Sequence, residues 1–248
     1  MSNITCLHFS GALSDVIFRD VTFPRLELFS SIDHFTPEIL KFLYRHPSIT
    51  KLFLSCDNIP DISTEFLPRL EYFSGTLSVA KKVIPGRPIT DIGLSWRSHT
   101  SEERTDEIIK GFTLSSTPIL RFSSTALYPQ DNRFFLITTI ARYFPYLQSL
   151  QLINLALEGV SDRLFVNSLT RLLPSLKHLQ HLTVASIFSI HDMSELQEVE
   201  TTVEWRRLCP QLNFVVFPNY LRYVAKGLEI TSLLNPLHPI QVLYITNL

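Results

Sequence analysis

The chain has 248 residues, of which 45% are hydrophobic, enough to fill one large core or two small ones. Its 22 basic and 23 acidic residues nearly cancel and form no basic patch, so we expect neither nucleic acid nor a membrane as a partner. Three distant cysteines, no signal peptide and no apolar run of roughly 18 residues predict a soluble protein of the cytoplasm or nucleus.

A phrase of eight residues occurs twice in the first third of the chain, as PRLELFSS from Pro24 and as PRLEYFSG from Pro68. It consists of a proline, a leucine two residues later, and a final pair of apolar or small residues separated by one position. Looser copies are PSITKLFL from Pro47, PYLQSLQL from Pro145 and PQLNFVVF from Pro210. A unit that recurs in this way predicts a repeat protein.

Each final pair predicts a short strand, because alternation sends its two members to one face and the residue between them to the other. With the weaker copies included, the first inward residues are Leu7, Phe29, Leu52, Phe73, Ile92, Leu120, Leu150, Leu182, Val215 and Leu243. Successive members lie between 19 and 33 residues apart. In the eighth copy the register is ambiguous, and we choose Leu182 because Leu179 would turn His181 inward.

Amphipathic segments between the strands predict helices. The first begins at Thr36-Pro37-Glu38, which supplies an N-cap, a proline at the first helical position and an early acid. Longer helices are predicted over residues 101–111, 132–143, 161–173 and 194–208. We expect Gly111 to end the first of these longer helices. The apolar face predicted for the last one consists of Leu196, Val199, Val203 and Leu208.

Short strands that alternate with helices predict an α/β fold, a leucine-rich-repeat solenoid forming a single domain over residues 1–248 with about ten repeats. Neighbouring strands are about 4.8 Å apart and packed helices about 8–10 Å, so the sheet should line the concave face of an arc and the helices the convex face. Because predicted strands lie near both ends of the sequence, we expect an array without polar caps, which is either a fragment of a longer array or needs a neighbour to cover it.

The repeats resemble the leucine-rich-repeat region of fungal F-box proteins. The segments that carry the resemblance are TPEILKFLYRHPSITKLFL from Thr36, FLPRLEYFSGTLSVAKKVIPGRPITDIGLSW from Phe66 and RRLCPQLNFVVFP from Arg206. In that family an amino-terminal F-box binds a Skp-type adaptor, and the repeats capture a substrate for ubiquitin transfer. The F-box itself is not present here, since the first predicted strand already falls at Leu7. The resemblance implies the substrate-recognition part of a Skp–cullin–F-box ubiquitin ligase, with a Skp-type adaptor as partner only if an F-box lies upstream.

Residues that could carry chemistry do not match a recognised catalytic or metal motif. The histidines at 178, 181 and 191 lack ligating neighbours at metal spacing, and the acids at 102, 103, 106 and 107 begin a helix, whose dipole they complement. Cys209 is expected to be a buried structural thiol, and Trp96 and Trp205 to serve in packing. We therefore predict a protein that is not an enzyme, with no catalytic residue, cofactor or metal.

The outward strand positions are more informative, because aromatic and arginine residues there are typical of protein interfaces. The predicted protein-binding residues of the concave face are Phe53, Tyr72, Arg121, Gln151, Phe214, Val216 and Tyr244. A protein partner on this face is the leading hypothesis. The alternative is an enzyme of unknown activity on a doubly wound α/β sheet, since alternating strands and helices are typical of both folds.

Overall fold

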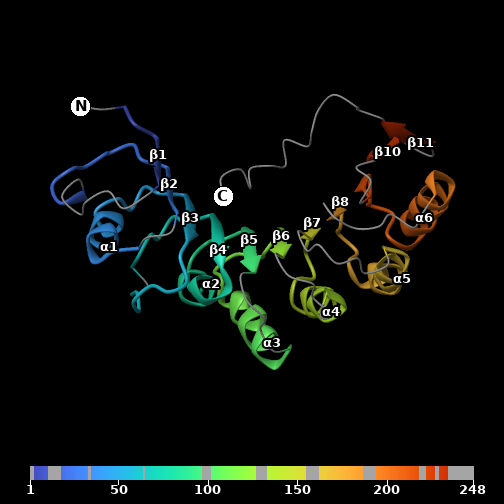
Figure 1. Ribbon diagram of the computed structural model, residues 1–248, viewed down its shortest axis with the longest axis horizontal. Helices are drawn as coiled ribbons and strands as arrows, with labels where there is room; N and C mark the ends of the chain where they lie inside the picture. Colours follow the sequence, from blue (N-terminus) through green and yellow to red (C-terminus); the bar gives the residue numbers. More distant parts are fainter. Residues whose placement is uncertain are drawn as a thin grey trace.

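One sheet runs through the computed structural model, and its strands follow one another in chain order (Figure 1). The structure describes residues 3–10, 18–32, 35–63, 65–96, 102–126, 133–154, 162–186, 194–217, 222–226 and 229–233. In these ranges the parallel strands are β1 (Cys6–Ser10), β2 (Leu28–Ile32), β3 (Lys51–Ser55), β4 (Tyr72–Thr76), β5 (Asp91–Trp96), β6 (Arg121–Ala126), β7 (Ser149–Asn154), β8 (His181–Ser186) and β9 (Phe214–Val216). Two antiparallel strands, β10 (Arg222–Lys226) and β11 (Glu229–Leu233), continue the sheet.

The helices all lie on one side of this sheet. In the described residues they are α1 (Pro37–Tyr44), α2 (Leu77–Val83), α3 (Glu102–Gly111), α4 (Arg133–Tyr143), α5 (Asp162–Leu172) and α6 (Glu195–Leu208). Short 3₁₀ helices, η2 (Phe112–Leu114) and η3 (Leu173–Ser175), follow α3 and α5. Figure 1 shows the strands on the inner side of an arc and the helices on its outer side. The expected α/β fold on a parallel sheet is confirmed.

Strand pairing tests the predicted register directly. Nine of the ten predicted inward residues lie in the described ranges, and eight of these align across neighbouring strands as predicted. The sixth, Leu120, is wrong by two residues, because Phe122 pairs with Ile92 and is buried. In the eighth copy, Leu182 pairs with Leu150, which confirms the chosen register. The tenth predicted strand, at 243, lies outside the described residues, and the β10–β11 hairpin was not predicted.

A buried apolar residue stands three positions before each inward residue from β2 to β9. These anchors are Leu26, Ile49, Leu70, Ile89, Ile119, Leu147, Leu179 and Leu212. Six of the eight donate their backbone N–H to the carbonyl three residues earlier, as Leu26 does to Phe23 at 3.0 Å. Proline at the position after that carbonyl, such as Pro24, suits the turn because its fixed φ matches the first central position. The proline of the repeated phrase thus closes a turn whose last residue is the anchor.

One carbonyl near the start of each unit joins that unit to the next. The oxygen of Thr50 accepts the N–H groups of Glu71 at 2.9 Å and Tyr72 at 3.0 Å. The oxygen of Gln148 accepts those of Gln180 and His181 in the same way. The pattern recurs at every step from β1 to β9, so each strand begins level with its neighbour.

The predicted helix ends agree with the structure better than the predicted apolar face of α6 does. Thr36 accepts the N–H of Ile39 and Pro37 opens α1, as expected, and Ser194 forms a reciprocal capping box with Gln197 at the start of α6. Gly111 does end α3, but its φ of −58° is helical and the chain continues directly into η2.

The predicted apolar face of α6 is correct for Val199 and Leu208, which are partly buried against the core, and wrong for its other two residues. Leu196 and Val203 are 67% and 54% exposed, whereas Glu198, Thr202 and Trp205 are buried. Buried polar groups are tolerated when they are hydrogen-bonded, and the Thr202 hydroxyl donates to the Glu198 carbonyl at 2.8 Å. The bulk of Trp205 therefore decides which face of α6 packs inward.

The described part of the connection between β3 and β4 contains no helix, and the buried side chain of Arg87, which follows α2, contacts this connection. Its guanidinium donates from Nε to the carbonyl of Phe66 at 2.6 Å and from Nη2 to that of Ser63 at 2.7 Å. Nη1 donates to the carbonyl of Val83 on α2 at 2.7 Å. Burial lowers the pKa of Arg87 below its ordinary value, and the carbonyl oxygens supply the polar environment that the charge requires. The side chain fastens the β3–β4 loop to α2.

The topology is incompatible with a doubly wound sheet. Such a sheet has helices on both faces and a reversal in strand order, where ligands bind. Here the order of the described strands is sequential from β1 to β11, and the helices cover one face (Figure 1). The fold assumed for the alternative function is therefore contradicted.

Candidate functional site

Two rows of side chains cover the inner side of the arc. The first, called the leading row, is Cys6, Leu28, Lys51, Tyr72, Asp91, Arg121, Ser149, His181 and Phe214. Two residues further along each strand, the central row is His8, Ser30, Phe53, Ser74, Gly93, Ser123, Gln151, Thr183 and Val216. Both rows alternate with the buried inward residues, so they share the face that the helices do not cover. We call these two rows the concave face.

An aromatic pair occupies the concave face on β3 and β4. The rings of Phe53 and Tyr72 are 4.9 Å apart at their centroids, and both side chains are half-buried. Burial raises the pKa of Tyr72 above its ordinary value; a hydrogen bond with Ser74 opposes this shift and the Asp91 carboxylate adds to it. The phenol therefore keeps its proton and remains a hydrogen-bond donor at neutral pH.

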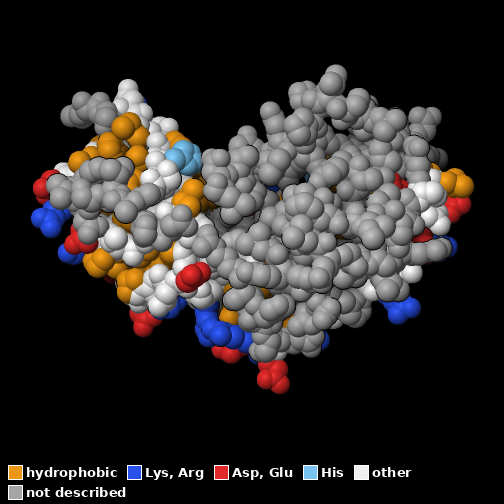
Figure 2. Space-filling model, in the orientation of Figure 1, with side chains coloured by type: hydrophobic (Ala, Val, Ile, Leu, Met, Phe, Trp, Pro, Cys, Tyr) orange, Lys and Arg blue, Asp and Glu red, His pale blue; other side chains and the backbone are white. Residues whose placement is uncertain are grey.

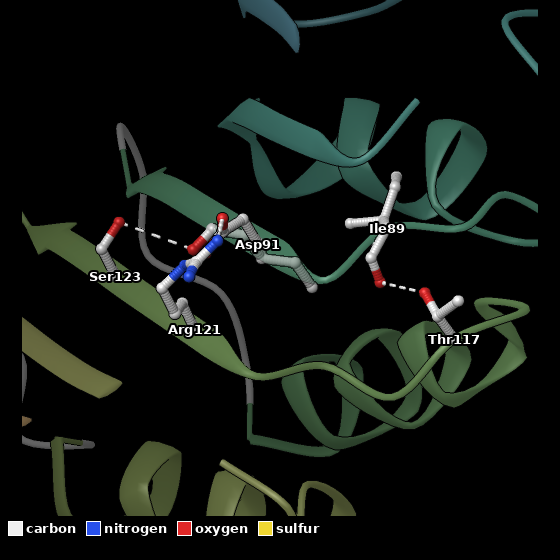
Figure 3. Close-up of polar contacts among 6 residues, drawn as sticks. Ile89, Asp91, Thr117, Arg121 and Ser123 are labelled. Carbon is white, nitrogen blue, oxygen red and sulfur yellow. Dashed lines mark hydrogen bonds and ion pairs between the residues drawn. The ribbon is translucent and has the colours of Figure 1, made fainter. Parts of the chain in front are cut away.

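An ion pair continues the leading row on β5 and β6. Asp91 accepts hydrogen bonds from Nε and Nη2 of Arg121, a bidentate pairing that fixes the plane of the guanidinium (Figure 3). The hydrogen bond with Asp91 raises the pKa of Arg121, so this cation stays charged. The Arg121 side chain is 59% exposed and that of Asp91 only 16%, so the cation is the more accessible partner.

Small side chains lie beside this ion pair in the central row. Gly93 stands between Ser74 and Ser123, and a Cβ on Gly93 would lie 2.9 Å from one hydroxyl oxygen and 3.2 Å from the other. Ser123 Oγ lies 3.5 Å from the carbonyl oxygen of Ile92 (Figure 3). Because these central-row side chains are small, they leave the guanidinium of Arg121 accessible on this part of the face.

A second ring pair lies towards the other end of the array. His181 and Phe214, on β8 and β9, have ring centroids 5.9 Å apart, with His181 exposed and Phe214 half-buried. Gln151 is half-buried in the central row between this pair and Arg121. These positions agree with the predicted face.

Two residues of the predicted surface are not part of it as described. Val216 is only 4% exposed, and it pairs with Arg222 of β10, so it lies inside the sheet and not at its edge. Tyr244 lies outside the described residues. The sequence prediction also placed Arg121 in the central row and Ile119 in the leading row, but Arg121 belongs to the leading row and Ile119 is buried before β6.

The structure adds Asp91, Lys51 and His181 to the predicted site residues. The signal that could have found them is their strand position, because each pairs across the sheet with a residue of the leading row. The sequence prediction included Arg121 but omitted Asp91, the acid that orients it.

The histidines and acids considered as metal ligands or catalytic groups contact residues that serve in packing or in ion pairs. His178 packs against the ring of Tyr146, with 5.7 Å between the centroids, and His191 lies outside the described residues. Asp106 on α3 accepts hydrogen bonds from Arg142 and Tyr143 of α4, and Glu107 pairs with Lys81 of α2. These acids join neighbouring helices on the outer side of the arc.

The cysteine and tryptophans considered as reactive or ligand-binding residues are packed in the core. Cys209 is buried, its thiol donates to the carbonyls of Leu176 and Leu179, and burial raises its pKa. Trp96 donates to Ser124 Oγ at 2.8 Å and Trp205 to Thr170 Oγ1 at 2.6 Å. Within the described ranges, no three His, Cys, Asp or Glu residues are grouped so that they could hold a metal ion.

No protein-family model matches the chain, and no curated protein matches it. Among the helices that the structure describes, none has the length and apolar character to cross a membrane. On the face shown in Figure 2, coloured basic and acidic side chains are interspersed along the outer rim.

Proposed function

We propose that the chain is a non-enzymatic protein-binding module, built as a leucine-rich-repeat array, which recognises its partner with the concave face. The observation that carries the proposal is the continuous group Phe53, Tyr72, Asp91 and Arg121 on four neighbouring strands. It joins a half-buried aromatic pair to an exposed arginine, and such residues are enriched at protein interfaces.

Two further observations support a repeat array as the scaffold. The buried anchor and the doubly accepting carbonyl recur from unit to unit, so each strand contacts mainly its neighbours in sequence. The resemblance to fungal F-box proteins extends the proposal: the partner is then a substrate of a Skp–cullin–F-box ubiquitin ligase, which acts in the cytoplasm or nucleus. That extension depends on the resemblance alone, whereas the concave face supports protein binding in general.

The test is affinity capture from the native cell with the wild-type chain and with Tyr72→Ala as baits. Truncation of an anchoring aromatic side chain costs about 2 kcal/mol or more, which corresponds to a loss of roughly thirtyfold in affinity. Leu196→Ala on α6 is the matched control, because Leu196 is 67% exposed on the outer side of the arc.

We expect Tyr72→Ala to lose partners that wild type and Leu196→Ala retain. Partners that persist with Tyr72→Ala and are lost with Leu196→Ala would contradict the proposed site. Turnover of a small molecule by the purified chain, with no captured protein, would contradict the functional class.

A further inference from the structure

The accessible charge of the concave face is cationic, although the whole chain has a net charge of −1. Among the described residues of the two rows, Asp91 is the only acid, and its side chain is 16% exposed. The cations are more accessible: the Arg121 side chain is 59% exposed, and Lys51 is exposed beside Tyr72. The exposed acids Glu27 and Glu71 lie one position before the leading row, outside both rows. A partner therefore meets positive charge first.

Arg121 retains hydrogen-bonding capacity that Asp91 does not use. A guanidinium has five N–H donors, and Asp91 accepts from Nε and from Nη2. Nη1 makes no further hydrogen bond within the part of the chain that the structure describes. This nitrogen lies on the side of the guanidinium away from the Asp91 pairing, so a second carboxylate can approach it without displacing the first.

The distance between the aromatic pair and Arg121 is short enough for one peptide segment to contact both. Tyr72 and Arg121 are in the same row, two strand spacings apart, which is about 10 Å. A polyproline II segment rises about 3.1 Å per residue with three residues per turn, so side chains three residues apart lie on one side, about 9 Å apart, and reach both positions.

We propose that the concave face binds an acidic segment of a partner protein. A carboxylate of that segment pairs with the open edge of Arg121, and an aromatic or aliphatic side chain about three residues away packs on Phe53 and Tyr72. This inference rests on the proposed function and deepens it. Asp91 has two effects in this arrangement: it orients the guanidinium, and its negative charge reduces the affinity for the incoming carboxylate.

The double effect of Asp91 gives a test with opposite outcomes for acidic and basic partners. Asp91→Asn keeps the shape and one acceptor oxygen but removes the negative charge. An acidic segment should then bind about fivefold more tightly, because like charges across an interface oppose association. A basic segment should bind more weakly.

The probe is a phage-displayed library of random twelve-residue peptides, selected on the whole chain and counter-selected on Tyr72→Ala. The best peptides are synthesised, and their Kd values are measured for wild type, Asp91→Asn, Arg121→Gln and Lys81→Gln. Lys81→Gln is the matched control, because Lys81 is an exposed cation paired with Glu107 on the helical side. We expect Asp or Glu about three positions from an apolar residue, tighter binding by Asp91→Asn, binding at least fivefold weaker by Arg121→Gln and no change for Lys81→Gln.

The remaining outcomes separate the inference from the proposed function. Selected peptides rich in Lys and Arg, or weaker binding by Asp91→Asn, would overturn the acidic segment while leaving the concave face as a binding site. If the selected peptides bind Arg121→Gln as tightly as the wild type, they do not use the guanidinium, and the acidic segment is wrong while the dependence on Tyr72 remains. If no peptide is selected, the inference is wrong, and affinity capture decides the proposed function separately. Circular dichroism establishes that each variant is folded, and Arg121→Gln provides the test by itself if Asp91→Asn is not.

Discussion

The units before β5 and the units after it support the same sheet in different ways. From β1 to β5 the inward residues are 19 to 23 residues apart, α1 has 8 residues and α2 has 7, and the described part of the β3–β4 connection contains no helix. From β5 to β9 each connection contains a helix of 10 to 14 residues. The strand starts are nevertheless joined by the same hydrogen bonds in both regions.

Bulky rings fill the early region where helices are short. The rings of Phe18, Phe29 and Phe42 form one cluster, with centroids 5.0 to 6.2 Å apart. His46 closes this cluster, accepting the N–H of Phe23 at 2.8 Å through Nε2 while Nδ1 lies 2.7 Å from the carbonyl oxygen of Phe42. The guanidinium of Arg87 holds the β3–β4 loop, whose described part contains no helix.

In the later region, contacts between neighbouring helices support the sheet instead of aromatic rings. Arg142 of α4 pairs with Asp106 of α3 at 3.4 Å, and Trp205 of α6 donates to Thr170 of α5. The strand ladder thus requires a filled layer beneath the sheet and hydrogen-bonded carbonyls in the loops. In the early region the aromatic rings and the Arg87 guanidinium meet this requirement, and in the later region the stacked helices do.

We expect the largest difference in stability between the two regions when Arg87 is replaced by methionine. The substitution leaves the buried carbonyls of Phe66 and Val83, and the partly buried one of Ser63, without these donors. Each buried unsatisfied group costs about 1–3 kcal/mol, so we expect a loss of roughly 3 kcal/mol or more in the free energy of unfolding. Urea denaturation measures it. Arg142→Met is the control from the later region, and because its ion pair is exposed we expect a loss of about 1 kcal/mol or less. Equal losses would contradict the contrast between the regions.

Gly75 in β4 tests how tightly the early layer is filled. A Cβ there would lie 2.5 Å from the carbonyl oxygen of Leu54 and 2.8 Å from Cζ of Phe73. Overpacking of this kind costs about 1–3 kcal/mol, and the backbone oxygen has little room to move, so we expect Gly75→Ala to cost roughly 2–3 kcal/mol. At Gly111 a Cβ would meet nothing within 4 Å, and the φ of −58° is helical. Gly111→Ala should therefore stabilise the chain by about 0.4–1 kcal/mol. A neutral Gly75→Ala would show that the layer is loose.

Helix caps should contribute equally in the two regions, because capping is a local interaction. Thr36 caps α1 and Ser194 caps α6, each through its side-chain oxygen. We expect Thr36→Ala and Ser194→Ala each to lower the free energy of unfolding by about 1 kcal/mol. A much larger loss for one of them would show that its region depends on helix formation more than the other does.

The pH dependence of stability should come partly from His46 in the early region. Burial holds the pKa of this side chain below its ordinary value of 6.5 in the folded chain; the hydrogen bond to the Phe42 carbonyl opposes this shift, and the charge of Arg45 adds to it. The unfolded chain then takes up the proton more readily. The contribution of His46 to stability is complete above pH 6.5 and is lost progressively as pH falls through the folded-state pKa. Melting temperatures of wild type and His46→Gln between pH 8 and pH 5 measure the effect, and we expect the variant to depend less on pH over the acidic half of that range. Parallel curves would contradict this role.

The repeated phrase was sufficient to predict the strands but not every register. The prediction fails at Leu120 because it took the first member of the apolar pair Leu120 and Phe122, whereas the second is the inward residue. The proline gives no better register, since Pro118 stands four residues before Phe122 and Pro68 five before Phe73. Spacing from the buried anchor succeeds, since Ile119 precedes Phe122 by three residues as in the other units. The anchor is the better guide because its burial fixes the turn, whereas the proline only favours it.

The face of α6 and the β10–β11 hairpin could not be obtained from the same reasoning. A periodic apolar pattern indicated Leu196 and Val203, but a single large ring, Trp205, determines the packed face. The hairpin has a weak sequence signal, Gly227, in the two-residue gap between β10 and β11. For the binding face, strand alternation predicted the aromatic positions, while the Asp91–Arg121 pairing required the correct register of β6.

Native-state hydrogen exchange in the wild type and in Arg87→Met tests the central claim, that one strand ladder is supported locally by different means. The amides to compare are those of Tyr72 and Asp91, near Arg87, and those of Ser149 and His181 in the later region. We expect all four to be protected in the wild type, and the variant to lose protection at Tyr72 and Asp91 while Ser149 and His181 keep most of theirs, because each unit of a repeat array contacts mainly its neighbours. Equal loss at all four amides, or no protection at Tyr72 in the wild type, would contradict the account.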